Sequence, residues 1–157
     1  MSGYLKDGEW KTGTDDGFAD EDGSFKRSTT DYRDWITPDG SPGPDGQDAV
    51  KAEPDRFHLY VSYACPWAHR TLITRRLKGI EQHIPVSVTH WLMRERGWTF
   101  DDGPGVVPDP NENAGTIHEL YQIGDRNVSG KATVPVLWDK QERRIVNNSN
   151  DNSNFAK

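Results

Sequence analysis

Residues 62–70 read SYACPWAHR and hold the only cysteine of the 157-residue chain. The run that leads into them, RFHLYVSY at 56–63, is short, aromatic and β-branched, which is typical of a strand. Pro66 follows the cysteine directly, and proline is favoured at the first position of a helix because its missing N–H would have no partner there. The stretch therefore predicts a strand that ends just before Cys65 and a helix that begins at Pro66.

The segment after Cys65 fits one helix followed by a second strand. The helix is predicted over 65–80, where apolar residues recur near helical spacing and Gly79 is a typical C-terminal stop. This apolar stripe consists of Ala68, Leu72, Ile73 and Leu77. The run IPVSVT at 84–89 then predicts a second strand, and a long Gly/Pro-rich loop follows at 94–110.

The last third of the chain predicts another helix and two more strands. The helix fits NENAGTIHELYQIG at 111–124, and the strands fit ATVPVLWD at 132–139 and RRIVN at 143–147. The core positions of that helix are Ile117, Leu120, Tyr121 and Ile123. The resulting order, β-α-β-α-β-β, is that of an α/β thioredoxin-like fold, which should finish with one more helix. Residues 148–157, NSNDNSNFAK, have no apolar stripe, so we expect that last helix to be incomplete.

Composition divides the chain into three parts. Residues 1–55 are rich in Gly, Asp, Pro and Thr and show no apolar periodicity, residues 56–148 hold the predicted domain, and residues 149–157 form a polar tail. The larger apolar side chains of the first part are Trp10, Phe18, Phe25, Tyr32, Trp35 and Ile36. They favour an extended, loop-rich segment laid over the core, with a disordered tail as the alternative.

The overall composition limits the classes of partner. The net charge of −6 and the pI of about 5.3 argue against nucleic-acid binding, which calls for a basic face. No apolar run approaches the roughly 18 residues of a membrane helix, and the opening MSGYLKDGEW has no signal-peptide core. A single cysteine excludes an intramolecular disulfide and fits a reducing compartment. We therefore expect one cytoplasmic domain with neither nucleic-acid nor membrane partners.

Cys65 is predicted to cap the helix that begins at Pro66. Its sulfur could accept hydrogen bonds from the free N–H groups of Trp67 or Ala68, and such sites lower a thiol pKa from about 8.5 toward roughly 3.5–7.5. Ala68 occupies the position of the second cysteine in a C-x-x-C motif, so a small thiol from solution would have to resolve any mixed disulfide. Two alternatives are a buried, inert cysteine and a zinc pair with His69, although structural zinc requires four ligands. We expect His69 on the helix surface.

The run TVPVLWD at 133–139 is a second landmark. Proline at the start of a strand is tolerated where its N–H is not needed. In a thioredoxin-like fold this is the place for a cis X-Pro bond that faces the active cysteine. The backbone of Val134 would then pair with an extended, peptide-like ligand, whereas a trans Pro135 that merely starts the strand is the alternative.

Several stretches together resemble the glutathionyl-hydroquinone reductases, also called Xi-class glutathione transferases. They are YVSYACPWAHRTLITRRLKG at 60–79, RGWTFDD at 96–102 and TVPVLWDK at 133–140, with DGSPGPDG at 39–46 similar to the N-terminal region of the same family. The resemblance extends over about residues 4–148. The CPWAHRTL and GWTF motifs are specific in combination, whereas a bare Cys-Pro would not be.

This resemblance implies a thioredoxin-like domain that binds glutathione as co-substrate, without a metal. In the family the cysteine removes glutathione from a glutathionyl-hydroquinone, and a second glutathione releases the enzyme and leaves as the disulfide. Carried over by motif, Cys65 is the nucleophile, Trp98 lies against glutathione, and Val134 with Pro135 holds its peptide backbone. Lys131 stands where the family often has arginine and would contact a carboxylate. A family-like homodimer is also implied.

The sequence departs from the family at its C-terminal end. A Glu-Ser pair that grips the γ-glutamyl group of glutathione is replaced here by Ser149 and Asn150, and the all-α domain of the family does not follow. Without the last helix, one face of the sheet is expected to expose apolar area. The alternative function is therefore that of a truncated, catalytically impaired fragment or a thioredoxin-like interaction module.

Overall fold

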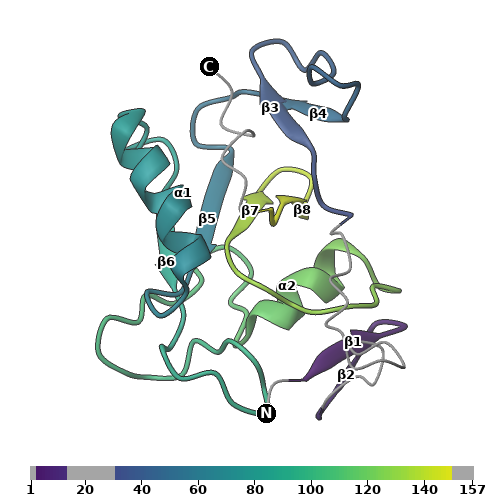
Figure 1. Ribbon diagram of the computed structural model, residues 1–157, viewed down its shortest axis with the longest axis vertical. Helices are drawn as coiled ribbons and strands as arrows, with labels where there is room; N and C mark the ends of the chain where they lie inside the picture. The colour runs from purple at the N-terminus through teal and green to yellow at the C-terminus, as the bar shows by residue number, and fades with distance from the viewer. Residues whose placement is uncertain (1–2, 14–30, 150–157) are drawn as a thin grey trace, which may run out of the picture.

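A four-stranded sheet forms the centre of the computed structural model, which describes residues 3–13 and 31–149 (Figure 1). The strand order is β6-β5-β7-β8. The four strands are β5 (Phe57–Val61), β6 (Val86–Val88), β7 (Val136–Asp139) and β8 (Arg144–Asn147). Strand β5 pairs in parallel with β6 and antiparallel with β7, and β7 and β8 form an antiparallel hairpin. The predicted β-α-β-α-β-β order of residues 56–147 is confirmed.

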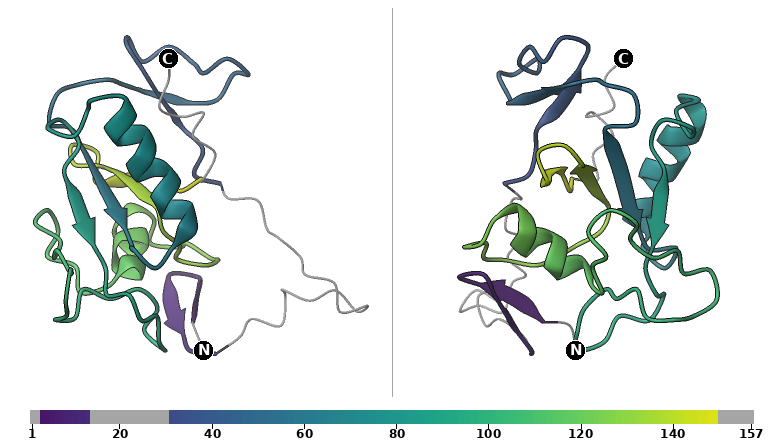
Figure 2. Two further views of the ribbon diagram at one scale, coloured as in Figure 1. Left: turned by 60° about the vertical axis from the view of Figure 1, so that its left-hand side comes forward. Right: turned by 180° about the vertical axis from the view of Figure 1, so that it is seen from behind.

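The two helices lie on opposite sides of this sheet (Figure 2). They are α1 (Pro66–Leu77) and α2 (Ile117–Gly124). Every residue of β5 and β7 is buried, and the described part of the sheet leaves no large apolar side chain exposed. The expectation of an exposed apolar sheet face is therefore wrong. Residues 32–34 run along the outer edge of β8, where the Asp34 N–H donates to the Val146 carbonyl at 3.1 Å.

Helix α1 begins and ends where the sequence predicts. Cys65 is its N-cap, Pro66 its first residue and Lys78 its C-cap. Gly79 adopts a positive φ of 65°, its N–H donates to the Arg76 carbonyl, and the next N–H donates to the Arg75 carbonyl, which is a Schellman stop.

The predicted apolar stripe of α1 is only partly correct. Ala68 is fully buried and Leu72 packs partly against the core, but Ile73 and Leu77 are 57% and 82% exposed. The helix instead buries Thr71, whose hydroxyl donates to the Ala68 carbonyl within the helix and so needs no partner in the sheet. The side of α1 that packs on the sheet therefore contains fewer apolar residues than predicted, and it includes a threonine.

Helix α2 begins six residues later than predicted, at Ile117 rather than 111. The reason is Asp109, whose carboxylate accepts the N–H groups of Asn111, Glu112 and Ala114 at 2.9–3.1 Å and so folds this segment into a loop. Ile117, Leu120 and Tyr121 are buried as expected, whereas Ile123 is exposed, because it faces away from the sheet.

Within residues 3–13 and 31–55, the structure has four short strands that sequence periodicity did not predict. They are β1 (Tyr4–Lys6), β2 (Glu9–Lys11), β3 (Trp35–Thr37) and β4 (Ala49–Lys51). Strands β1 and β2 form an antiparallel hairpin, and β3 and β4 form a parallel pair. Leu5 and Val50 are buried in the core, and Trp10, Tyr32 and Ile36 pack partly against it. Phe18, Phe25 and the tail after Ser149 lie outside the described residues.

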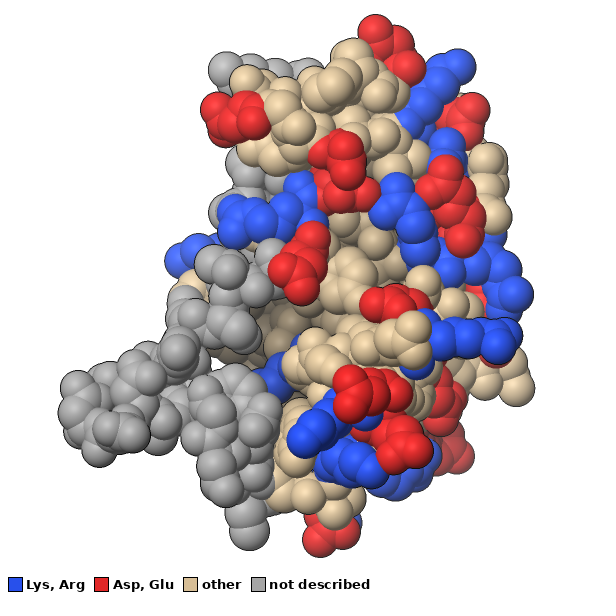
Figure 3. Space-filling model, turned by 90° about the vertical axis from the view of Figure 1, so that its right-hand side faces the viewer, with Lys and Arg blue, Asp and Glu red and all other residues tan. Residues whose placement is uncertain are grey.

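Acidic and basic side chains are interspersed over the face shown in Figure 3. That face carries no continuous basic stripe of the kind that tracks a nucleic-acid backbone. Within residues 3–13 and 31–149, neither helix has the length and apolar character needed to span a bilayer.

Candidate functional site

The candidate site lies at the N-terminal end of α1, where the short loop after β5 leads into the helix. Cys65 has extended backbone angles (φ −98°, ψ 112°) and its side chain is 9% exposed. The Cys65 Sγ–H donates to the carbonyl oxygen of Val134 at an S···O distance of 3.6 Å. Val134 precedes β7, which pairs with β5, so the sheet itself brings these two residues together.

One detail of the predicted cysteine geometry is wrong. The Cys65 sulfur accepts no hydrogen bond from the free N–H groups at the start of α1. Its thiol instead donates a hydrogen bond to the carbonyl oxygen of Val134. The helix start itself, with Cys65 as N-cap and Pro66 as the first residue, is as predicted.

The peptide bond between Val134 and Pro135 is cis, as predicted for this landmark. Both residues are buried, and β7 begins directly after them because Pro135 has no N–H to contribute to the ladder. The Val134 N–H has no hydrogen-bond acceptor among the described residues. The edge of this segment is therefore open to a further hydrogen bond beside the Cys65 sulfur.

A buried tyrosine holds the segment that carries Val134. The Tyr121 hydroxyl donates to the Thr133 carbonyl at 3.1 Å and accepts the Thr133 N–H at 3.2 Å. The side-chain amide of Asn148 donates to the same hydroxyl at 2.7 Å. Helix α2 and the end of β8 thus fix the backbone that faces the cysteine, an arrangement that the sequence analysis missed.

The exposed rim around Cys65 is aromatic and basic. Tyr63 and Trp67 are exposed, and the Arg70 guanidinium lies 4.8 Å from the centre of the Trp67 ring, a cation–π contact. His69 is exposed on α1. In the part of the chain that the structure describes, no group of three or more His, Cys, Asp or Glu side chains is arranged to hold a metal ion.

Two other predicted site residues lie in loops rather than at the cysteine itself. Trp98 is in the loop after β6, half-buried against the core, and its carbonyl accepts the N–H of Ile117 at 2.9 Å. Lys131 is exposed, four residues before Pro135. The structure brings Cys65, Val134 and Pro135 together, whereas no hydrogen bond joins Trp98 or Lys131 to Cys65.

Buried polar side chains support the sheet below the site. The Tyr60 hydroxyl donates to Asp109 at 2.6 Å, and a His58 ring nitrogen lies 2.9 Å from the Ser87 hydroxyl. Burial opposes the charge on Asp109, but the hydrogen bonds from Tyr60 and the loop N–H groups outweigh it and hold the pKa of Asp109 below its ordinary value. Burial lowers the pKa of His58 to about 4, so this ring is neutral at pH 7. These residues have structural roles.

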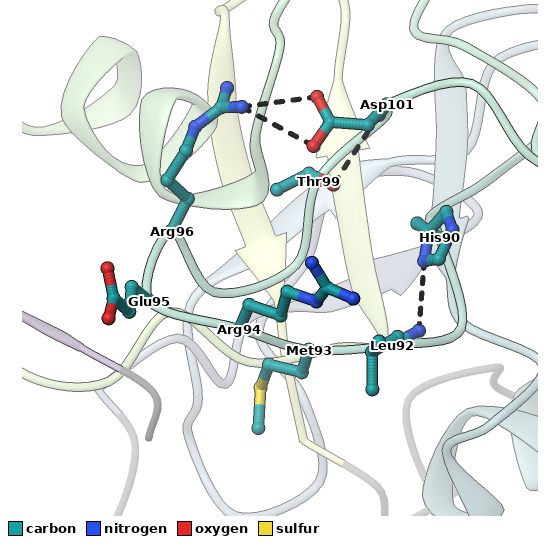
Figure 4. Close-up of a pocket in the computed structure, with 8 residues that line it drawn as sticks. All are labelled: His90, Leu92, Met93, Arg94, Glu95, Arg96, Thr99 and Asp101. Carbon is teal, nitrogen blue, oxygen red and sulfur yellow. Dashed lines mark hydrogen bonds and ion pairs between the residues drawn. The ribbon is translucent and has the colours of Figure 1, made fainter.

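A pocket of about 700 Å³ opens at the carboxyl end of β6 (Figure 4). Its lining residues are His90, Leu92, Met93, Arg94, Glu95, Arg96, Thr99 and Asp101. Strands β5 and β6 are parallel, so the loops that follow them emerge at the same edge of the sheet. The pocket therefore lies on the edge of the sheet that also carries the Cys65 loop.

Residues 64–152 match the family described as "Glutathione S-transferase, N-terminal domain". Glutathionyl-hydroquinone reductase YqjG of Escherichia coli is 51% identical over 147 residues, which is 93% of this chain and 44% of YqjG. Glutathionyl-hydroquinone reductase PcpF of Sphingobium chlorophenolicum is 43% identical over 147 residues, 93% of this chain and 43% of PcpF. The chain thus spans less than half the length of these relatives.

Solved structures agree with the sequence comparison. The glutathione-bound structure of E. coli YqjG matches with a TM-score of 0.77 at 47% identity, covering 94% of this chain and 42% of YqjG. The Xi glutathione S-transferase of Phanerochaete chrysosporium matches with a TM-score of 0.74 at 45% identity, covering 84% and 40%. The fold is therefore the thioredoxin-like α/β fold of a glutathione transferase N-terminal domain, as predicted. The chain belongs to the glutathione S-transferase family, as a homologue of the N-terminal part of its Xi-class glutathionyl-hydroquinone reductases.

Proposed function

We propose that this chain binds glutathione and uses Cys65 to remove it from glutathionyl-hydroquinones. The main observation that supports this proposal is that the only cysteine lies at the start of α1, against the backbone of Val134. A glutathione laid along this segment would have its own amide and carbonyl groups opposite Val134 and its sulfur near Cys65. Lys131 is proposed to bind a carboxylate of glutathione, and Trp98 is proposed to pack against the glutathione molecule.

The proposed reaction has two thiol-exchange steps. The Cys65 thiolate attacks the sulfur of the glutathionyl-hydroquinone, the bond between that sulfur and the ring carbon breaks, and the ring carbon takes up a proton. This step leaves a hydroquinone and a Cys65–glutathione disulfide. The thiolate of a second glutathione attacks the glutathione sulfur of that disulfide and leaves as oxidised glutathione, restoring Cys65. The positive end of the α1 dipole would stabilise the thiolate in both steps.

Reaction with oxidised glutathione tests the proposal directly. Cys65 is the only cysteine, so an intact-mass increase of one glutathionyl group locates the modification without further mapping. We expect the folded chain to be modified faster than the same chain unfolded in urea at the same pH, because the folded site binds the reagent beside the sulfur. A folded thiol that reacts more slowly than the unfolded one would contradict a glutathione site.

Release of hydroquinone from a glutathionyl-hydroquinone is the second readout. We expect activity with excess glutathione for the wild type and only the background rate for Cys65→Ser. Arg70→Gln serves as the matched control for a change at the exposed rim, and it should keep measurable turnover. Turnover by Cys65→Ser equal to that of the wild type would exclude Cys65 as the nucleophile.

One observation favours a second candidate, a thioredoxin-like interaction module without thiol chemistry. In this structure Cys65 is buried and its thiol is engaged as a donor to Val134, which is also the geometry of an inert core cysteine. For such a module we expect neither mass gain with oxidised glutathione nor hydroquinone release. The two experiments above separate the candidates.

A further inference from the structure

The loop that follows β6 contains an arginine, Arg94, that has no ion-pair partner among the residues that the structure describes. Among the described residues, Arg94 forms neither an ion pair nor a side-chain hydrogen bond. Figure 4 shows its guanidinium directed into the pocket, whereas the Glu95 side chain points away from it. The other acidic lining residue, Asp101, is paired with Arg96 at 3.2 and 3.4 Å. Arg94 is therefore the basic lining residue of this pocket whose guanidinium has no acidic partner among the described residues.

The walls beside Arg94 are apolar and suited to a flat ring. Leu92 and Met93 line the pocket and are among the exposed large apolar residues of the chain. The His90 ring stacks on Trp91 with 5.0 Å between centroids, and its Nδ1 accepts the Leu92 N–H at 3.0 Å, which fixes this wall. At about 700 Å³ the pocket is within the roughly 300–1,000 Å³ range of small-molecule sites.

The backbone that carries Arg94 is anchored from two sides. The Gly97 N–H donates to the Arg94 carbonyl at 2.8 Å and closes a tight turn, in which Gly97 has a φ of 71°. The Trp10 indole N–H donates to the Glu95 carbonyl at 3.0 Å, and the Trp10 ring lies against Gly97. The pocket is thus preformed by contacts between the N-terminal hairpin and the loop, which limits the ordering needed on binding.

The segment that follows the pocket loop lies against the loop that leads to Cys65. A side-chain carbon at Gly105, which follows the pocket loop, would lie 4.0 Å from the ring of Tyr63. Tyr63 is two residues before Cys65, so the loops after β5 and β6 approach each other at this edge. The loop that lines the pocket therefore continues into a segment that lies against the cysteine loop.

From this arrangement we propose that the pocket binds a small aromatic carboxylate. The ring would lie on Leu92 and Met93. The carboxylate would accept two parallel hydrogen bonds from the Arg94 guanidinium. Resting on the proposed function, this ligand is the aromatic ring that the reaction releases from glutathione, so the chain favours glutathione conjugates of aromatic acids over those of neutral rings. Binding of the free aromatic acid does not depend on that chemistry.

Binding of 2-naphthoate and its neutral counterpart 2-naphthamide tests this proposal. Titrations use the full 157-residue chain carrying Cys65→Ser, without glutathione, so that thiol chemistry is excluded. We expect 2-naphthoate to bind more tightly than 2-naphthamide, and Arg94→Gln to weaken naphthoate binding about tenfold while leaving naphthamide unchanged. Arg126→Gln, which removes an exposed charge elsewhere, is the matched control and should bind as the parent does.

Each result bears on one proposal separately. Equal binding of the acid and the amide, no binding of either, or an acid preference that persists in Arg94→Gln overturns the pocket assignment. Because Arg94 is exposed, circular dichroism of Arg94→Gln should match that of the parent and exclude misfolding as the cause. Naphthoate binding that depends on Arg94, together with no hydroquinone release by the wild type, would support the pocket and contradict the proposed enzyme.

Discussion

The hydroxyl of Tyr121 joins three groups that fix the backbone opposite Cys65. It bonds to the Thr133 carbonyl and N–H and to the side-chain amide of Asn148. Burial raises the pKa of this hydroxyl, so it remains a donor at neutral pH. We expect Tyr121→Phe to lower the free energy of unfolding by about 1–3 kcal/mol, because two partly buried donors lose the hydroxyl as an acceptor. Urea denaturation followed by far-UV circular dichroism measures this change.

The matched control for Tyr121→Phe is Tyr63→Phe. Tyr63 is exposed at the rim of the site, and removal of its hydroxyl should change the free energy of unfolding by less than about 0.5 kcal/mol. Equal stability of the two variants would contradict this prediction, because it would show that the hydrogen bonds of Tyr121 add nothing to the free energy of unfolding beyond what bonds to water provide.

The difference between Cys65 and Tyr121 also shows which site features the sequence could predict. The N-cap position of Cys65 depends on its immediate neighbours, a preceding strand and Pro66, so a local pattern was sufficient. The partners of Tyr121 lie 12 and 27 positions away, and no local pattern encodes such a contact. The same applies to the Cys65–Val134 hydrogen bond, which depends on how β5 and β7 pair.

At the scale of secondary structure, the side chains of Thr116 and Glu119 cap the start of α2, in an arrangement similar to a capping box. The Thr116 hydroxyl accepts the Glu119 N–H at 3.4 Å, and the Glu119 carboxylate accepts the Gly115 N–H at 2.7 Å. We expect Thr116→Ala to lower the free energy of unfolding by about 1 kcal/mol, because the first turn of α2 loses an acceptor. Thermal and urea denaturation at neutral pH provide the measurement.

Thr74→Ala provides the control for this prediction. Thr74 lies in the interior of α1 and is partly exposed, and its hydroxyl donates to the Arg70 carbonyl within the helix. Alanine has the higher helix propensity there, so this variant should be as stable as the wild type or slightly more stable. If both substitutions had the same effect, the cap of α2 would not be a determinant of stability.

The elements that sequence periodicity did not predict share one property. Strands β1 to β4 are three residues long, too short for an alternating pattern to stand out. They exist because of tertiary partners, as when Leu5 exchanges both backbone hydrogen bonds with Gly130, at 2.8 Å each. By contrast, β5 and α1 carry their own local patterns, and their positions were predicted to within a few residues.

At the scale of the whole molecule, the N-terminal hairpin is part of the core. The Leu5 side chain is 1% exposed, and the hairpin bonds to three separate segments. Besides Gly130, these are α2, through Gln122 to the Gly8 carbonyl at 2.7 Å, and the pocket loop, through Trp10 to Glu95. Residues 3–13 therefore connect helix α2 with the loop that carries Arg94 and Trp98.

Truncation of Leu5 tests whether hairpin and domain unfold together. We expect Leu5→Ala to lower the free energy of unfolding by about 2–5 kcal/mol, because it leaves a cavity between the hairpin and the core. The change should appear as an earlier midpoint of a single urea transition, recorded in parallel by tryptophan fluorescence and far-UV circular dichroism. Leu77→Ala, at an 82% exposed position, should shift that midpoint little, since no buried contact is lost. An unchanged main transition in Leu5→Ala would mean that the hairpin is an appendage, because only then could its core contact be removed without weakening the sheet and the two helices.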